Sequence, residues 1–409
     1  MFSQVLWSAV LVTALTACSV YQRQPVIVSA AQEAISSAEL PINRFEDWRA
    51  HFYQKALKQG IDEQTLHQLL DNVQENPQIV ALDRKQPEFA KMPWEYLSSA
   101  VSQTRIDSGR KKIREQSALL QSLEAQTGVP AQIIAAIWGM ETSYGAATGK
   151  SNLVNALATL AYEGRRREFA EQQLMALARL LSTGDVPWQP LTGSWAGGMG
   201  HTQFIPETWL NYGVDANGDG IRNPWDKADA LASTANYLAR SGWKRNLPWG
   251  VEVQLPAQAD ANWIGEKHTF ADWQRLGLRA VSGSLPANAM AELWLPAGIH
   301  GPALLLSDNF RVIKVYNNSS NYALAVALLG EALKGKAGLK TPWPRDERPL
   351  STEQIRLLQQ RLSAQGYDTK GTDGILGANT RKAFQAWQRA NGQFADGFVS
   401  QNSASTLLQ

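Results

Sequence analysis

One carboxylate stands at the end of an apolar run, on the side that the run would bury. The run PAQIIAAIWGMETSYG begins at Pro130, a good first residue for a helix. Within it Ile133, Ile137 and Glu141 recur at i, i+4 and i+8, so an amphipathic helix aims them at one side. Burial raises the pKa of a carboxyl group, and the negative end of the helix dipole acts in the same direction. Glu141 is therefore a candidate general acid near neutral pH, or alternatively a structural carboxylate that caps the helix or pairs with an arginine.

A glycine-rich stretch, GSWAGGMGHTQFIPETW (193–209), supplies polar groups of a different kind. Its glycines and Ser194 predict a tight turn in which the backbone approaches a ligand or another element. The stretch is not a GxGxxG phosphate loop, no Lys-Ser/Thr follows it, and Ser194 lacks the GxSxG setting of a nucleophilic serine. The hydroxyl of Ser194 and the amide of Gln203 are therefore expected to orient a ligand beside an acid.

The segment VDANGDGIRNPWD (214–226) has the spacing of a calcium-binding loop. The expected ligands are Asp215, Asn217, Asp219, the backbone carbonyl of Ile221, and Asp226. Asp226 replaces the usual, longer glutamate, so we expect weak binding of calcium, or of sodium, in a structural loop of residues 215–226. A polar turn that binds no ion is the alternative.

The composition describes a folded chain of two or three domains and excludes some classes of function. The 409 residues are 44% hydrophobic and 19% charged, so the chain can bury a core. The net charge of +2 lacks the excess of positive charge that is typical of proteins that bind nucleic acid. None of the five histidines has zinc-site spacing, so a histidine-based metal enzyme is not expected and no cofactor is expected for catalysis. The 15 tryptophans offer flat faces that stack on sugar rings, bases or other aromatic groups, although many of them will belong to the core.

The first residues read as a targeting segment. Residues 1–17 are mostly apolar and carry no charged side chain. The segment is too short for a typical membrane-spanning helix and has the length of a secretory signal. The segment ends in LTAC, which resembles a bacterial lipoprotein signal that is cleaved before Cys18 and lipidated there. Residues 18–42 read as a tether, and Ser19 favours the outer membrane over the inner one by the same resemblance. An ordinary signal peptide followed by an incidental cysteine is the alternative.

The elements that must position these side chains are mainly helical. The pattern from Phe45 to about Tyr237 is helical, and short β-type runs follow over about 248–316, including ALLLSDNFRVIKVY. Residues 336–350 are rich in proline and charge and read as a linker. A small helical domain over 351–409 contains an internal echo, in which DGILGANTRKAF and DGFVSQNSASTL each begin with Asp-Gly. The predicted class is mainly α (α+β).

Four motifs together resemble the membrane-bound lytic transglycosylase B family, glycoside hydrolase family 103. They are WGMETSYG, GSWAGGMGHTQFIPETW, ANYLARSGW (235–243) and VIKVYNNSSNYALAV (312–326), within a catalytic domain of residues 43–335. The resemblance implies a lysozyme-like helical core with a small β-rich subdomain. It also implies cleavage of the MurNAc–GlcNAc bond of peptidoglycan without water, which leaves 1,6-anhydro-MurNAc ends.

The same resemblance implies roles for single residues. Glu141 would act as acid and then as base, while Ser194 and Gln203 would bind the muramyl N-acetyl group. Tyr237, Tyr316 and Tyr96 would line the cleft, and Arg165 and Arg166 would face the peptide stem. The metal loop also has its counterpart in the family.

The last domain resembles the type 1 peptidoglycan-binding domain, with Ser400 in its second repeat where glycine is usual. The expected partners are peptidoglycan strands, the outer membrane through the lipid anchor, and cell-wall synthases or amidases, with a periplasmic location and no nucleic acid. Two alternatives stay open at this point: a muramidase that uses water, and a wall-binding scaffold without activity.

Overall fold

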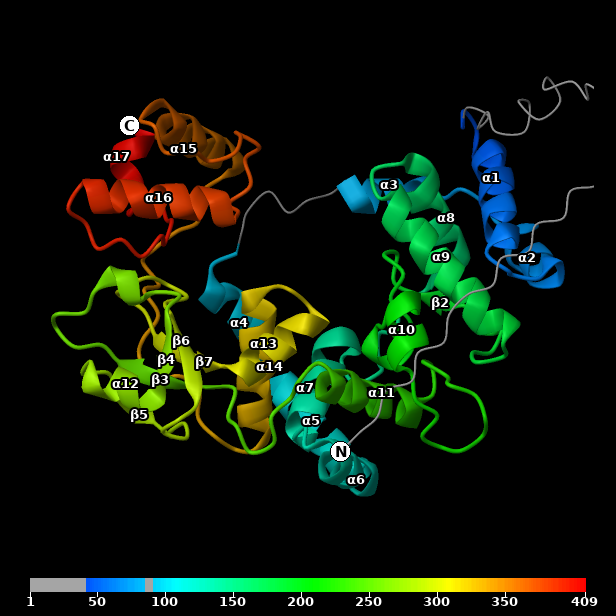
Figure 1. Cartoon of the computed structure of the whole chain (residues 1–409), viewed down its shortest axis with the longest axis horizontal. Coiled ribbons are helices and arrows are strands. Elements are labelled where there is room, and N and C mark those ends of the chain that lie inside the picture. The colour runs from blue at the N-terminus through cyan, green and yellow to red at the C-terminus, as the bar shows by residue number, and fades with distance from the viewer. Residues whose placement is uncertain (1–41, 85–90) are drawn as a thin grey trace, which may run out of the picture.

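The computed structural model describes residues 42–84 and 91–409, and it is mainly helical, as expected. Figure 1 shows a helical lobe, a central group of helices, a sheet and a C-terminal helical domain. The expected signal segment, Cys18 and nearly all of the tether lie outside the described residues. Within the described ranges, no helix is both long and apolar enough to cross a membrane.

The helical lobe is built on α8 (Leu153–Glu163) and α9 (Arg167–Ser182), which pack against each other. Trp48 lies fully buried in this lobe, and its indole N–H donates to Oε1 of Glu171 at 3.0 Å. Lys55 neutralises the same buried carboxylate at 2.6 Å, so the lobe carries a satisfied polar group inside its core. Its other helices are α1 (Phe45–Lys58), α2 (Glu63–Leu70), α3 (Pro77–Arg84) and α10 (Pro206–Tyr212).

The central group surrounds α7 (Ala131–Thr142), the helix that the sequence predicted for the run that begins at Pro130. Residues 133–139 are all buried, so the helix is covered on every side rather than on one face. α14 (Ser320–Leu333) packs along α7, and Gly330 permits this approach because a Cβ there would lie 2.9 Å from Cδ1 of Ile133. The other members are α4 (Pro93–Ala100), α5 (Gln103–Glu115), α6 (Ser117–Thr127), α11 (Lys227–Arg240) and α13 (Asp308–Tyr316).

The β-rich part is one antiparallel sheet in the order β4-β6-β7-β3-β5, with the short helix α12 (Phe270–Arg275) beside it. Its strands are β3 (Gly250–Gln254), β4 (Lys267–Thr269), β5 (Arg279–Ser282), β6 (Met290–Trp294) and β7 (Ala303–Ser307). The prediction of β structure up to residue 316 was wrong for residues 308–316, which form α13. Ser307 caps that helix by accepting the N–H of Asn309 at 3.2 Å, and Val312 and Ile313 are buried in the central core, so packing overrides their β preference.

The C-terminal domain contains α15 (Thr352–Ala364), α16 (Ala378–Ala390) and α17 (Ser405–Leu408). Its two Asp-Gly repeats make the same hydrogen bonds. Gln359 donates to Oδ1 of Asp373 at 2.8 Å and accepts the N–H of Gly374 at 2.9 Å. In the second repeat, Gln388 donates to Oδ1 of Asp396 at 3.1 Å and accepts the N–H of Gly397 at 2.8 Å.

Ser400, which replaces the usual glycine of the second repeat, makes its own turn. Its N–H donates to Oγ of Ser403 at 2.9 Å, and the N–H of Ser403 donates to Oγ of Ser400 at 3.0 Å. This reciprocal pair begins the last turn of the domain without glycine.

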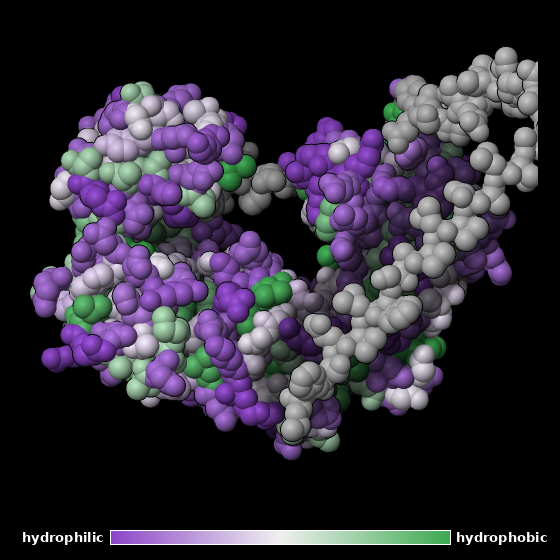
Figure 2. All heavy atoms as spheres, in the orientation of Figure 1, coloured by the Kyte–Doolittle hydropathy of each residue, from purple (hydrophilic) through white to green (hydrophobic). Residues whose placement is uncertain are grey.

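The C-terminal domain also contacts the sheet region directly. The N–H of Ile299 donates to Oδ2 of Asp396 at 3.0 Å, and Arg389 donates to Oδ1 of Asn262 at 2.8 Å. In Figure 2 the surfaces that border the open space between this domain and the helical lobe are mostly hydrophilic.

Candidate active site

Glu141 occupies the last turn of α7, at the point where the central helix reaches the surface of the core. Ile137 and Trp138 beside it are fully buried, whereas Glu141 itself is only partly buried. The helix stops at once because Ser143 and Tyr144 take left-handed backbone conformations, with φ of 50° and 62°. The ring of Tyr144 fills the space left by the missing side chain of Gly139, whose Cβ would lie 2.5 Å from Cζ of that ring.

Burial raises the pKa of Glu141 to about 7. The hydroxyl of Tyr322 donates to its Oε1 at 2.5 Å and acts in the opposite direction, because a hydrogen bond to the carboxylate favours the charged form. The net result is a carboxyl group that holds its proton near neutral pH and can still release it. This is the state that a general acid requires.

Tyr322 is a site residue that the sequence analysis did not name. It lies 181 residues away from Glu141 along the chain and is buried in α14, where a tyrosine reads as an ordinary core residue. The only available signal was its place in the segment 312–326, the same motif that supplied Tyr316.

The glycine-rich turn packs closely against other backbone, as its composition predicted. A Cβ on Gly149 would collide with the backbone of Gly193, and one on Gly200 would collide with the carbonyl of Pro224. Each of these glycines therefore permits a close approach that an alanine would prevent. Thr142, the residue after Glu141, donates to the carbonyl of His201 at 2.6 Å, which ties this turn to the end of α7.

Ser194 and Gln203 meet in this turn on either side of Gly198. Gln203 donates both amide hydrogens to backbone carbonyls, of Thr148 at 3.0 Å and Gly200 at 2.8 Å, which leaves its Oε1 as an acceptor. Oγ of Ser194 accepts the N–H of Gly198 at 2.8 Å, which leaves its own hydrogen to donate. A Cβ on Gly198 would lie 2.7 Å from Oε1 of Gln203 and 2.9 Å from Oγ of Ser194, so the acceptor and the donor are close together.

This pairing matches the chemistry of an acetamido group. Such a group carries one N–H donor and one carbonyl acceptor. Gln203 can accept from the former and Ser194 can donate to the latter, while the backbone bonds of both residues hold them in place.

The three predicted tyrosines lie around the same site. Tyr316 donates to the carbonyl of Thr202 at 2.6 Å, and burial raises its pKa, with a further contribution from the charge of Glu141. Tyr237 packs against Tyr316 with ring centroids 5.9 Å apart. Burial also raises the pKa of Tyr96, again with a contribution from the charge of Glu141, so that carboxylate acts on both Tyr96 and Tyr316.

Arg165 and Arg166 follow α8 in the helical lobe, where both pair with a buried carboxylate of α3. Arg165 donates from Nε to Oδ2 of Asp83 at 2.9 Å, and Arg166 approaches Oδ1 of Asp83 at 3.6 Å. The guanidinium of Arg166 also lies 4.4 Å from the centre of the Phe169 ring. Both arginines therefore pair with a buried acid of their own lobe.

Residues 215–226 form consecutive turns closed by their own side chains. Oδ1 and Oδ2 of Asp215 accept the N–H groups of Gly218 at 2.7 Å and Gly220 at 2.9 Å. Asp226 caps α11 by accepting the N–H of Ala228 at 2.7 Å, so one of its oxygens is already used. In residues 42–84 and 91–409, no group of three or more His, Cys, Asp or Glu side chains is gathered closely enough to hold a metal ion. The loop has the turns of a calcium site, but its acids do not converge.

Comparison with known proteins defines the class of this enzyme. Residues 44–331 match the family described as Transglycosylase SLT domain, and residues 351–406 match the one described as Putative peptidoglycan binding domain. The chain belongs to the SLT transglycosylase family, and it is a peptidoglycan lytic transglycosylase with a C-terminal peptidoglycan-binding domain. The family resemblance read from the four motifs is confirmed.

Three relatives show how similar this chain is to known members of that class. Membrane-bound lytic murein transglycosylase B of Escherichia coli (strain K12) is 31% identical over 301 residues, which cover 68% of this chain and 79% of that protein. The structure of SltB3 from Pseudomonas aeruginosa with NAG-anhNAM-pentapeptide has 46% identity and a TM-score of 0.86, covering 90% of this chain and 100% of that one. The structure of Slt35 from Escherichia coli with calcium has 29% identity and a TM-score of 0.61, covering 70% and 92%.

The geometry around Glu141 predicts a defined pH dependence. Only the protonated form can act as an acid, so kcat/KM should fall as pH rises through about 7. In Tyr322→Phe the hydrogen bond that favours the carboxylate is lost, so the pKa of Glu141 rises and the alkaline limb moves to higher pH. We expect kcat to fall by about tenfold as well, because hydrogen bonds to charged groups contribute about that much.

The pH profile of wall digestion by the full chain measures this shift. Tyr367→Phe in the C-terminal domain is the matched control. Within the described residues, the hydroxyl of Tyr367 makes no hydrogen bond. An alkaline limb that stays in place or moves to lower pH in Tyr322→Phe would contradict the assignment.

Proposed function

We propose that this enzyme cleaves the β-1,4 bond between MurNAc and GlcNAc with Glu141 as its only catalytic carboxyl group. The observation that carries the proposal is the pKa of about 7 of Glu141, set by burial and by the hydrogen bond from Tyr322. Protonated Glu141 donates its proton to the glycosidic oxygen, and the bond from C1 to that oxygen breaks. The same carboxyl group is then ionised and available as a base.

The substrate supplies what a second carboxylate supplies in ordinary glycosidases, which use a pair of them. The acetamido oxygen of the muramyl residue stabilises the positive charge at C1, and Ser194 and Gln203 hold that group in position. The C6 hydroxyl of the same sugar then attacks C1, and Glu141 accepts its proton. The product is the 1,6-anhydro end, and proximity within one sugar replaces the activated water.

Three tyrosines complete the proposed cleft. Tyr316 and Tyr237 form one wall beside the turn that carries Gln203, and Tyr96 lies on the side of α4. We assign to Arg165 and Arg166 a contact with a peptide stem through the guanidinium hydrogens that Asp83 does not use.

A muramidase that uses water on the same scaffold is the nearest alternative. The relative SltB3 was solved in complex with NAG-anhNAM-pentapeptide, a ligand that carries the anhydro ring. This ligand favours the transglycosylase reaction over hydrolysis by a muramidase. Remodelling and turnover of the cell wall in the periplasm would be the role of such an enzyme, and synthases and amidases of the wall would be its protein partners.

Digestion of purified sacculi tests the reaction. We expect the wild-type chain to release muropeptides with 1,6-anhydro ends, identified by mass spectrometry. Glu141→Gln should lower the rate by at least about a hundredfold, because general acid–base catalysis contributes that much or more. Glu75→Gln, an exposed glutamate of the helical lobe, is the control. Reducing ends that have gained water would establish the muramidase instead, and clearing of the wall by Glu141→Gln at the wild-type rate would leave the chain without its proposed acid.

Thermal unfolding separates chemistry from folding in the same variant. The pKa of Glu141 is raised from its unfolded value of 4.5, so its contribution to stability is present below pH 4.5 and is lost as pH rises through about 7. Glu141→Gln should therefore gain stability relative to wild type over that interval. A folded but inactive variant assigns the lost activity to the carboxyl group.

We also propose that residues 215–226 bind calcium, or sodium, as a weak structural ion once the acidic side chains gather around it. The support is the ligand spacing, the turns around Asp215 and Asp219, and the calcium in the relative Slt35. We expect 5 mM calcium to raise the midpoint of thermal unfolding by about 2–4 °C, as about 1 kcal/mol of linked binding does for a large domain.

Two variants test whether a calcium-dependent shift comes from this loop. Asp215→Ala should abolish the shift, whereas Asp346→Ala in the exposed part of the linker should keep it. Sodium at the same ionic strength distinguishes the two ions. An equal shift in wild type and in Asp215→Ala would remove the ion from this loop.

The lipid anchor is the last part of the proposal. We propose that Cys18 carries the lipid and holds the enzyme at the outer membrane of a Gram-negative bacterium. The support is the apolar segment 1–17 with LTAC at its end, and a relative that is described as membrane-bound. Cys18→Ala should move the protein from the membrane to the soluble periplasmic fraction, as followed by immunoblot, with Ser19→Ala as the control; continued membrane fractionation of Cys18→Ala would contradict the anchor.

A further inference from the structure

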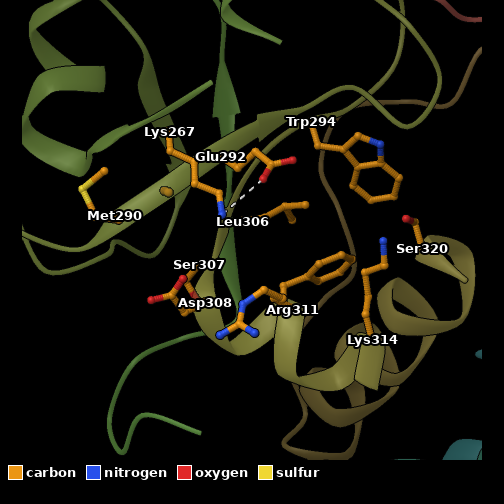
Figure 3. A pocket seen from close by; sticks show the side chains of 12 residues that line it. Lys267, Met290, Glu292, Trp294, Leu306, Ser307, Asp308, Arg311, Lys314 and Ser320 are labelled. Atoms are coloured by element: carbon orange, nitrogen blue, oxygen red, sulfur yellow. Dashed lines mark ion pairs between the residues drawn. The ribbon is translucent and has the colours of Figure 1, made fainter. Parts of the chain in front are cut away.

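Two adjoining pockets form a groove between the catalytic domain and the C-terminal domain. The smaller pocket, of about 140 Å³, lies between the sheet and α13, as Figure 3 shows. The larger one, of about 630 Å³, is lined by residues of both domains, including α16. Trp294 and Ser320 line both pockets, so the two adjoin at these side chains.

The carboxylates of the groove are already satisfied. Glu292 pairs with Lys267 at 3.7 Å, and Asp308 pairs with Lys244 at 2.5 Å. Asp396 accepts hydrogen bonds from Gln388 and from backbone N–H groups on both of its oxygens. Each of these acids therefore already has a partner of its own.

Several cations of the groove have no such partner. Within the ranges that the structure describes, no ion pair or hydrogen bond involves the side chains of Arg311, Lys314, Arg381 or Lys382. Arg311 acts on Asp308 through space without an ion pair. Two of these cations come from α13 and two from α16, so both domains contribute cations without an ion-pair partner to the groove.

Trp294 gives the groove an apolar surface between the two groups of charge. Its ring packs against Phe310 with centroids 5.8 Å apart and remains partly exposed. In Figure 3 the ammonium end of Lys314 extends toward Ser320 and Trp294. A cation, a hydroxyl and an indole face therefore lie together, which suits a ligand that carries both a carboxylate and aliphatic carbon.

We propose that this groove binds an acidic peptide, namely the peptide stem of a peptidoglycan strand held by the enzyme. Glycan rings are neutral, whereas the stems carry carboxylates, so the excess of cations selects the peptide. The assignment rests on the lytic transglycosylase function and adds to it a binding site shared by the two domains.

The site acts on binding rather than on the chemical step. Lys314 precedes Tyr316 by two residues on α13, and Ser320 precedes Tyr322 by two residues on α14. Two residues turn a helix by about 200°, so the groove and the catalytic tyrosines lie on opposite faces of these helices. A loss of charge in the groove should therefore raise KM and leave kcat unchanged.

Substitutions on either side of the groove test the proposal in the full chain. We expect Lys314→Ala, and separately Arg381→Ala with Lys382→Ala, to raise KM for peptide-bearing glycan strands by about tenfold, as loss of a charged hydrogen bond does. Titration with the soluble stem peptide L-Ala-γ-D-Glu-diaminopimelate-D-Ala should show a similar loss of affinity. Both effects should weaken as salt is added.

Strands stripped of their peptides by an amidase provide the discriminating substrate. On these strands the variants should match wild type, and Lys58→Ala, an exposed residue of the helical lobe, should match wild type on both substrates. Unchanged affinity for the soluble peptide, or an equal rise of KM on both kinds of strand, would overturn the proposal. Activity on stripped strands also shows that the transglycosylase itself is intact, which separates failure of the groove from failure of the enzyme.

Discussion

The structure depends on keeping one carboxyl group dry enough to hold a proton and open enough to meet a sugar. α7 achieves the first condition because the whole stretch 133–139 is buried, so Glu141 in its last turn is partly withdrawn from water. Two left-handed residues then end the helix immediately, which leaves the carboxyl group at the edge of the core. Tyr322 opposes the effect of burial by its hydrogen bond, and the balance of the two places the pKa at about 7.

The remainder of the site follows from where that helix ends. The chain after Glu141 has to pass beside the turn of residues 193–203, and glycines are required because backbone meets backbone there. The same closeness fixes Gln203, whose amide hydrogens bond to one carbonyl of each segment, Thr148 and Gly200. An acceptor held in this way costs little entropy when a ligand binds, so the packing that ends the helix also preorganises the neighbouring binding group.

Local patterns predicted the parts of the molecule that local physics determines. Period and hydrophobicity located the helix that carries Glu141, and the glycines indicated the close approach. The partners that come from distant segments were not readable in this way: Tyr322 looks like core, and Asp83, which pairs with Arg165, lies 82 residues before it. The start of α13 was misread because the run before it is apolar and β-like, whereas the helix depends on its cap at Ser307 and on packing against α14.

The second Asp-Gly repeat explains why the C-terminal domain sits beside the groove rather than on a free tether. Asp373 of the first repeat uses Oδ1 for its own turn, and Asp396 does the same with its Oδ1. Oδ2 of Asp396 instead accepts the N–H of Ile299 in the catalytic domain. One carboxylate thus folds its repeat and docks it, so α16 has a defined position and its cations add to those of α13. A wall-binding domain held in this way keeps its ligand close to the catalytic domain and so raises the local concentration of substrate.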